Sequence, residues 1–164
     1  MEQKNVLILC TGNSARSIIG EALINHLCVG RYRGYSAGSK PTGTPNPFAL
    51  RLLEEKGYET GFARSKTWSE FEGPNAPEMH FVFTVCDSAA NEACPVWPGA
   101  PMRAHWGIPD PAAATGSDDV IMEAFENAHA QLHARVSAFM ALSPDEMDPS
   151  DLKSKIAEIG KMGA

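Results

Sequence analysis

Apolar and polar positions alternate along the chain in blocks whose period switches between strand-like and helix-like. Apolar runs predict strands over residues 6–9 and 81–85, and two further short strands are expected over residues 32–37 and 102–106. Amphipathic patterns with start and stop signals predict four helices, over residues 18–30, 47–57, 117–139 and 148–160. The polar residues 58–78 indicate a loop with one helical turn near Trp68. Because strands alternate with helices, we expect an α/β fold with a doubly wound, four-stranded parallel sheet in three layers.

Length and charge restrict the class of protein. A chain of 164 residues suits a single hydrophobic core, and its net charge of −6 disfavours a basic surface for nucleic acid. No apolar run reaches the length of a signal peptide core or the roughly 18 residues of a membrane span. We therefore expect a cytoplasmic protein with no membrane partner. In a reducing compartment the four cysteines, Cys10, Cys28, Cys86 and Cys94, are expected to be catalytic or redox-active rather than structural disulfides.

The segment between the first strand and the first helix carries the strongest chemical signal. It reads Cys-Thr-Gly-Asn-Ser-Ala-Arg-Ser over residues 10–17. A tight loop that opens a helix turns its backbone N–H groups inward, which creates a nest for an anion. The planar guanidinium of Arg16 can hold two oxygens of a tetrahedral oxyanion. The residues expected to bind the oxyanion are Thr11, Gly12, Asn13, Ser14, Ala15, Arg16 and Ser17.

The same electrostatic field identifies Cys10 as the expected nucleophile. A helix N-terminus and an arginine can lower a cysteine pKa from about 8.5 to roughly 3.5–7.5, which favours the thiolate. Ser17 is placed to donate a hydrogen bond to the Cys10 sulfur, and Gly12 and Asn13 tolerate left-handed backbone conformations. The alternative is that Cys10 is a buried structural cysteine and Arg16 an unrelated surface residue.

Two further cysteines follow the third predicted strand. Cys86 comes directly after it, and Cys94 lies in the polar stretch 87–101. Their spacing contains no C-x-x-C pair and no matching histidine pair, so we predict no metal site. A thiol relay suits them better, in which Cys10 attacks the oxyanion, Cys86 attacks the adduct and Cys94 resolves the disulfide. The alternative is that Cys86 is a buried thiol at a strand end and Cys94 has no role.

Several motifs resemble one enzyme family. Residues 10–17 look like the phosphate loop of the low-molecular-weight protein tyrosine phosphatases, and Ser-Ala-Gly-Ser at 36–39 is similar to the segment after that family's second strand. Asp110-Pro111 resembles its general-acid loop, which implies that Asp110 protonates the leaving oxygen; taken alone, Asp110 is an ordinary turn residue. The resemblance implies a catalytic domain over residues 1–142. Residues 143–164 would then form a helical extension packed on it.

A subgroup of that family fits more closely. Thr-Val-Cys-Asp at 84–87, together with Cys94, the His-Trp-Gly of 105–107 and the Asp-Pro-Ala of 110–112, resembles arsenate reductases derived from these phosphatases. This implies arsenate or a phosphate-like oxyanion as the substrate and no bound cofactor. It also implies an external reductant, which is either thioredoxin or glutathione with glutaredoxin. Ala112 stands where the tyrosine phosphatases typically have an aromatic residue. Three residues match positions that line a potassium site in some related reductases: Asn13, Glu21 and Ser36.

Three functions are therefore in competition. The first is arsenate reduction through Cys10 and the thiol relay. The second is phosphomonoester hydrolysis through a cysteinyl-phosphate, which uses Cys10, Arg16 and Asp110 alone. The third is a non-enzymatic module that binds oxyanions or senses thiols. Outside the site, Cys28 is expected in the core, whereas His129 and His133 are expected on a solvated helix face.

Overall fold

A four-stranded parallel sheet forms the centre of the computed structural model, which describes residues 3–86 and 101–162. Its strand order is β2-β1-β3-β4, and every neighbouring pair is parallel. The strands are β1 Lys4–Leu9, β2 Tyr32–Ala37, β3 Phe81–Thr84 and β4 Met102–His105. The four predicted strands are thus confirmed.

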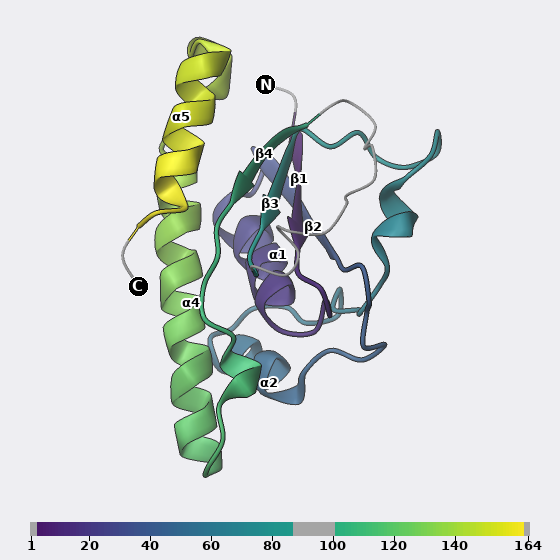
Figure 1. Cartoon of the computed structure of the whole chain (residues 1–164), viewed down its shortest axis with the longest axis vertical. Helices are drawn as coiled ribbons and strands as arrows, with labels where there is room; N and C mark the ends of the chain where they lie inside the picture. The colour runs from purple at the N-terminus through teal and green to yellow at the C-terminus, as the bar shows by residue number, and fades with distance from the viewer. Residues whose placement is uncertain (1–2, 87–100, 163–164) are drawn as a thin grey trace.

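The predicted helices are also present (Figure 1). They are α1 Arg16–Leu27, α2 Pro47–Glu55, α4 Asp118–Met140 and α5 Pro149–Ile159. Short 3₁₀ turns are η1 Trp68–Phe71, η2 Pro111–Ala113 and η3 Pro144–Glu146. Side-chain oxygens of Asn46, Ser117 and Asp148 cap α2, α4 and α5, because each accepts a hydrogen bond from a first-turn N–H group.

The two faces of the sheet are covered differently. Alternate residues of β1 and β3, such as Ile8 and Phe83, pack with α1, α4 and α5 in the larger core. Leu7, Leu9 and Val82 point the other way, into a smaller core that includes Phe71 of η1. Helices, sheet and the η1 segment make the three layers of the predicted α/β fold (Figure 1).

The last helix is tied to the edge of the sheet. Trp106 stacks on Phe83 with ring centroids 3.8 Å apart, and its indole N–H donates to the carbonyl oxygen of Ile156 at 3.0 Å. A Cβ on Gly160 would lie 2.1 Å from the carbonyl oxygen of His105, so only glycine allows this approach. The division into residues 1–142 and 143–164 stays a prediction.

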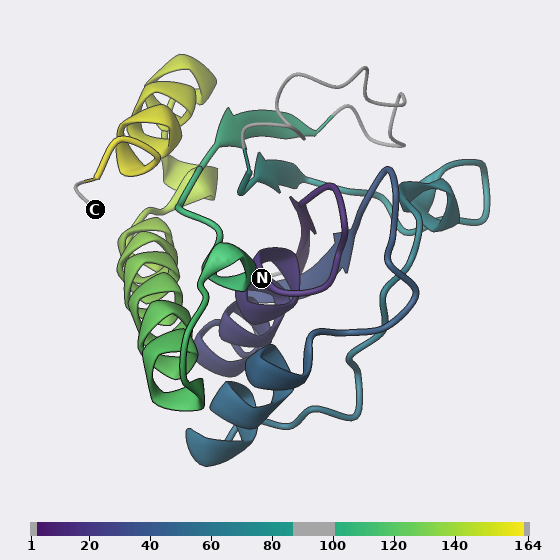
Figure 2. The ribbon, with the colours of Figure 1, turned by 60° about the horizontal axis from the view of Figure 1, so that its bottom comes forward.

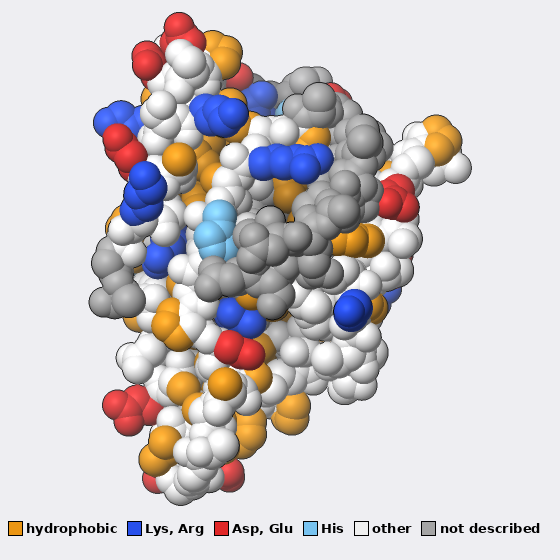
Figure 3. Space-filling model, in the orientation of Figure 1, with side chains coloured by type: hydrophobic (Ala, Val, Ile, Leu, Met, Phe, Trp, Pro, Cys, Tyr) orange, Lys and Arg blue, Asp and Glu red, His pale blue; other side chains and the backbone are white. Residues whose placement is uncertain are grey.

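The surface of the molecule bears on the expected partners. Across the part of the chain that the structure describes, no helix is long and apolar enough to cross a membrane. Charged side chains of both signs are interspersed on the face in Figure 3, and its coloured residues show no broad basic patch.

The strand order places the site. The chain leaves β1 through α1 to reach β2 on one side, whereas β3 lies on the other side of β1. This reversal opens a crevice beyond the carboxyl ends of β1 and β3, where open α/β sheets bind ligands. In Figure 2 the loop after β1 lies at this end, with η2 on one side and the segment after β2 on the other.

Candidate active site

The loop of residues 10–17, called the anion loop below, joins β1 to α1. Its carbonyl oxygens are held from outside by backbone N–H groups of the segment after β2: Thr11 O by Lys40 at 3.0 Å, Gly12 O by Thr42 at 3.0 Å and Ser14 O by Asn46 at 2.8 Å. Peptide units held by their oxygens on one side present their N–H groups on the other side. No side chain caps α1, so its first N–H groups also remain for a ligand.

Asn13 gives the loop its shape. It has φ 44°, the left-handed conformation that the sequence allowed for, whereas Gly12 does not have a positive φ. The Asn13 side chain is fully buried behind the loop, where its Nδ2 donates to Ser17 Oγ at 2.8 Å and to Ser36 Oγ at 3.0 Å. Asn13 and Ser17 therefore support the loop from behind, and neither side chain lines the cavity in front of it.

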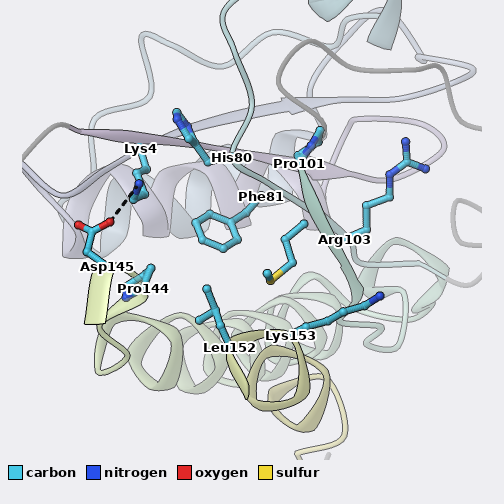
Figure 4. A pocket seen from close by; sticks show the side chains of 10 residues that line it. Lys4, His80, Phe81, Pro101, Arg103, Pro144, Asp145, Leu152 and Lys153 are labelled. Carbon is cyan, nitrogen blue, oxygen red and sulfur yellow. Dashed lines mark ion pairs between the residues drawn. The ribbon is translucent and has the colours of Figure 1, made fainter. Parts of the chain in front are cut away.

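A cavity of about 260 Å³ opens in front of the anion loop. The predicted residues that line it are Cys10, Thr11, Gly12, Ser14, Ala15, Arg16, Cys86 and Asp110. This volume lies below the roughly 300–1,000 Å³ of pockets for drug-sized ligands, so the cavity suits a small anion. A larger cavity of about 580 Å³ lies at the opposite end of the strands, with Phe81 and Leu152 near its centre and the Lys4–Asp145 ion pair at its edge (Figure 4).

Arg16 and Asp110 meet at the mouth of the smaller cavity. Arg16 Nη1 donates to the carbonyl oxygen of Ile108 at 3.1 Å, and Nη2 lies 3.5 Å from Asp110 Oδ2. Arg16 Nε is buried and has no hydrogen-bond partner among the described residues. A guanidinium has five N–H donors, so others remain for an oxyanion beside the contacts with Ile108 and Asp110. The Asp110 carboxylate is 42% exposed and accepts a hydrogen bond from Ala112 N at 3.0 Å. A carboxyl group beside the cavity can exchange protons both with solvent and with a bound ligand.

Cys10 and Cys86 lie side by side because of the strand register. Leu9 of β1 pairs with Thr84 of β3, and Val85 N donates to the Leu9 carbonyl oxygen at 2.9 Å. Cys10 is one residue and Cys86 two residues beyond this pair, so both lie at the same end of adjacent strands. The two thiols are buried, reduced and within hydrogen-bonding reach of each other. Thr11 N also donates to Cys86 Sγ at 3.4 Å.

This neighbour changes the expected ionisation of Cys10. The hydrogen bond with Cys86 and burial raise the pKa of the Cys10 thiol above its usual range, although Arg16 and the Gly12 N–H act to lower it. The prediction of a lowered pKa was therefore wrong for the thiol pair. Two thiols this close share one negative charge: the first proton is lost from the pair, and the second is lost only with difficulty.

Some residues at the site were not predicted from the sequence. Thr42 lines the cavity, and Lys66 lies behind the anion loop with its Nζ 3.6 Å from Glu21 Oε1. Both come from irregular segments with no periodic or motif signal. Cys94 falls outside the described residues, so its predicted role stays a prediction.

Two predictions concern residues away from the cavity. Cys28 is buried in the core, as expected. His129 is not on a solvated face: it is buried, and its Nε2 forms a 2.9 Å hydrogen bond with the Tyr58 hydroxyl. His133 is exposed. Within residues 3–86 and 101–162 no group of three or more histidine, cysteine or acidic side chains could hold a metal ion.

Known proteins resemble this chain over most of its length. The sequence pattern described as low molecular weight phosphotyrosine protein phosphatase matches residues 5–150. An arsenate reductase of Shouchella clausii is 34% identical over 139 residues, which are 85% of this chain and 96% of the relative.

Solved structures agree with these sequence matches. An arsenate reductase of Archaeoglobus fulgidus superposes with a TM-score of 0.65 at 25% identity, covering 84% of this chain and 99% of the other. A thioredoxin-dependent arsenate reductase of Corynebacterium glutamicum shares the fold, with a TM-score of 0.56 at 24% identity over 79% of this chain and 58% of the other.

Proposed function

Because the chain belongs to the low molecular weight phosphotyrosine protein phosphatase family, we propose that its cavity is the active site of an arsenate reductase. The observation that carries the proposal is the position of Cys86, which lines the cavity within hydrogen-bonding reach of Cys10. Ester hydrolysis needs one nucleophilic thiol. Reduction of arsenate to arsenite needs two electrons, which two thiols supply when they become a disulfide.

Arsenate binds in the cavity in front of the anion loop. Backbone N–H groups of the loop and of the start of α1 donate to its oxygens, and Arg16 adds positive charge and its remaining guanidinium N–H donors. Phosphate has the same shape and charge and binds in the same place. The small side chain of Ala112 lines this cavity and offers no aromatic wall for a phenyl ester.

Reduction then proceeds by two nucleophilic attacks, the first at arsenic and the second at sulfur. The Cys10 thiolate attacks arsenic, an arsenic–oxygen bond breaks, and Asp110 protonates the departing oxygen as water. The Cys86 thiolate next attacks Cys10 Sγ, so that a sulfur–sulfur bond forms and the sulfur–arsenic bond breaks. The electron pair of that bond stays on arsenic, which leaves as arsenite.

Turnover requires that the disulfide is passed on and reduced. In the proposed relay Cys94 attacks Cys86 Sγ, which forms a Cys86–Cys94 disulfide and frees Cys10. An external thiol system, either thioredoxin or glutathione with glutaredoxin, then reduces that disulfide. Such reductants are maintained in the cytoplasm, where we place the protein.

The test measures arsenate-dependent NADPH oxidation, coupled in parallel to thioredoxin and to glutathione with glutaredoxin. We expect turnover with one of the two systems and none for Cys10→Ser or Cys86→Ser. Cys28→Ser is the matched control, because Cys28 is also buried and reduced but does not line the cavity. Full reduction by Cys86→Ser would contradict the proposal.

A second activity, phosphomonoester hydrolysis, is favoured by Cys10, Arg16 and Asp110, which line the same cavity. Cys10 would form a cysteinyl-phosphate that water hydrolyses, with no part for Cys86. A phosphatase would therefore keep its hydrolysis of a small phosphoester in Cys86→Ser and show no arsenate reduction in the unmodified protein.

A further inference from the structure

A buried ion pair lies directly behind the anion loop. Lys66 and Glu21 have side chains only 5% and 8% exposed, with Nζ and Oε1 3.6 Å apart. Lys66 Nζ also donates to Ser36 Oγ at 3.2 Å and to the carbonyl oxygen of Arg64 at 3.1 Å. The ammonium group therefore has three oxygen neighbours from three separate segments of the chain.

The backbone around Lys66 holds this side chain in place. Lys66 O accepts a hydrogen bond from Gly38 N at 3.0 Å, and Trp68 N donates to Gly38 O at 2.9 Å. These bonds extend the edge of the sheet beside the end of β2, where Gly38 and Thr67 form a parallel bridge. Lys66 is thus fixed by the main chain on one side and by its buried ammonium group on the other.

The ion pair is connected to the residue that shapes the anion loop. Asn13 Oδ1 accepts a hydrogen bond from Lys66 N at 2.8 Å, and Asn13 Nδ2 donates to Ser36 Oγ at 3.0 Å. Ser36 in turn donates to Glu21. Any movement of Lys66 is therefore transmitted to Asn13, the left-handed residue on which the direction of the loop N–H groups depends.

This arrangement does not fit the potassium ion that the family resemblance implies. The oxygens of Glu21 and Ser36 already face Lys66 Nζ, and Asn13 directs its side-chain oxygen to Lys66 N. A potassium ion among them would be close to an ammonium group of the same sign, without free oxygen ligands. Burial raises the pKa of the Glu21 carboxyl and lowers the pKa of the Lys66 ammonium, so each charge depends on the other.

We propose that Lys66 is a positioning residue. Its ammonium group takes the place of a bound monovalent cation and, through Asn13 and Ser36, keeps the anion loop in the conformation that binds an oxyanion. The proposal rests on the proposed function only in that both use the same anion site. Because the Lys66 ammonium group supplies the positive charge, anion binding should not depend on potassium in this protein. The proposal also means that loss of the Lys66 charge creates a space with oxygen ligands that potassium fits.

The test measures the affinity for inorganic phosphate by calorimetry and the melting temperature. Each is measured in potassium chloride and in choline chloride at equal ionic strength. Unmodified protein should give the same values in both salts. Lys66→Met should bind phosphate about 10–100-fold more weakly in choline, the loss typical when a partner that orients a binding group is removed. Potassium should restore part of that affinity.

Lys56→Met is the matched control, because Lys56 forms a 2.9 Å ion pair with Glu126 on the surface, away from the anion loop. It should leave phosphate affinity unchanged in both salts. Tighter phosphate binding by the unmodified protein in potassium would overturn the proposal. So would a Lys66→Met protein with normal affinity, or one with the same deficit in both salts, since Lys66 would then have only a structural role.

A second variant covers the case in which Lys66→Met does not fold. The double change Lys66→Met and Glu21→Gln removes both buried charges, which proteins often tolerate. It should bind phosphate weakly and show no response to potassium, because the carboxylate ligand is gone; normal phosphate affinity would refute the proposal. Phosphate binding needs no turnover, so a failure of the arsenate reductase proposal would be visible separately.

Discussion

Gly38 is the position where one methyl group should damage the site most. It follows β2 and passes directly beneath the anion loop. A Cβ at this position would lie 2.3 Å from the carbonyl oxygen of Thr11 and 2.5 Å from that of Cys10. Both neighbours are backbone atoms, so no change of rotamer can relieve the overlap.

The size of the effect follows from these distances. Real Cβ atoms essentially never approach another atom within 3.0 Å, so in Gly38→Ala the loop or the strand must move by at least 3.0 − 2.3 = 0.7 Å. Overpacking of this kind costs about 1–3 kcal/mol, and each kcal/mol lowers the melting temperature by about 2–4 °C in a chain of this size. A displacement near 1 Å at a catalytic loop can reduce the rate about 100-fold.

The assay combines thermal unfolding with the kinetics of arsenate reduction. Gly57→Ala is the control: Gly57 has φ 83° and open space around its Cβ position, so alanine there costs about 1–2 kcal/mol through backbone conformation alone. Both variants should melt at lower temperature, and only Gly38→Ala should lose kcat/KM. Normal kcat/KM in a folded Gly38→Ala protein would refute the reasoning that this contact positions the loop.

Three further predictions concern protonation. Asp110→Asn should lower kcat about 10²–10⁴-fold with little change in KM, as steady-state kinetics would show. Cys86→Ala should abolish arsenate reduction and yet make Cys10 react faster with iodoacetamide at neutral pH, because the neighbour that raises the Cys10 pKa is removed. Burial lowers the pKa of His129 to about 4, so the unfolded chain gains this proton near pH 6.5 and the folded protein only near pH 4. Stability should fall over that pH range by about 3 kcal/mol, and thermal unfolding of His129→Gln should show a flatter pH dependence.

Local sequence pattern was sufficient to predict the helices and strands and to place two residues, Cys10 and Arg16, at the candidate site. The apolar runs and helix start signals such as Pro47 and Ser117 identify strands and helices with information that lies within a few residues. Cys10 and Arg16 could be identified for the same reason, since one strand–loop–helix unit creates the anion nest. The close approach of Gly38 to this loop gives a physical reason for the glycine of the Ser-Ala-Gly-Ser motif at the end of β2.

The residues that sequence reasoning missed come from segments without a pattern. Thr42 and Lys66 reach the site from irregular stretches, and only the folded chain places them against the anion loop. The error at His129 has a different cause. It is four residues after Phe125 and three before Leu132, both of which are buried, so the helical period puts it on the inner face. At this position the helical period, and not the polarity of the side chain, determines burial.

The thiol pair shows why a site cannot be judged from one loop. The anion loop alone favours a thiolate at Cys10, as a phosphatase requires, but the register of β1 and β3 brings Cys86 against it and opposes that ionisation. A second thiol is therefore a disadvantage for ester hydrolysis. It is an advantage for reduction, because the attacking sulfur of the second step is already in contact. In the proposed reaction Cys10 no longer competes with Cys86 for the one negative charge of the pair once it is bonded to arsenic, so the first step would favour the thiolate that the second step needs.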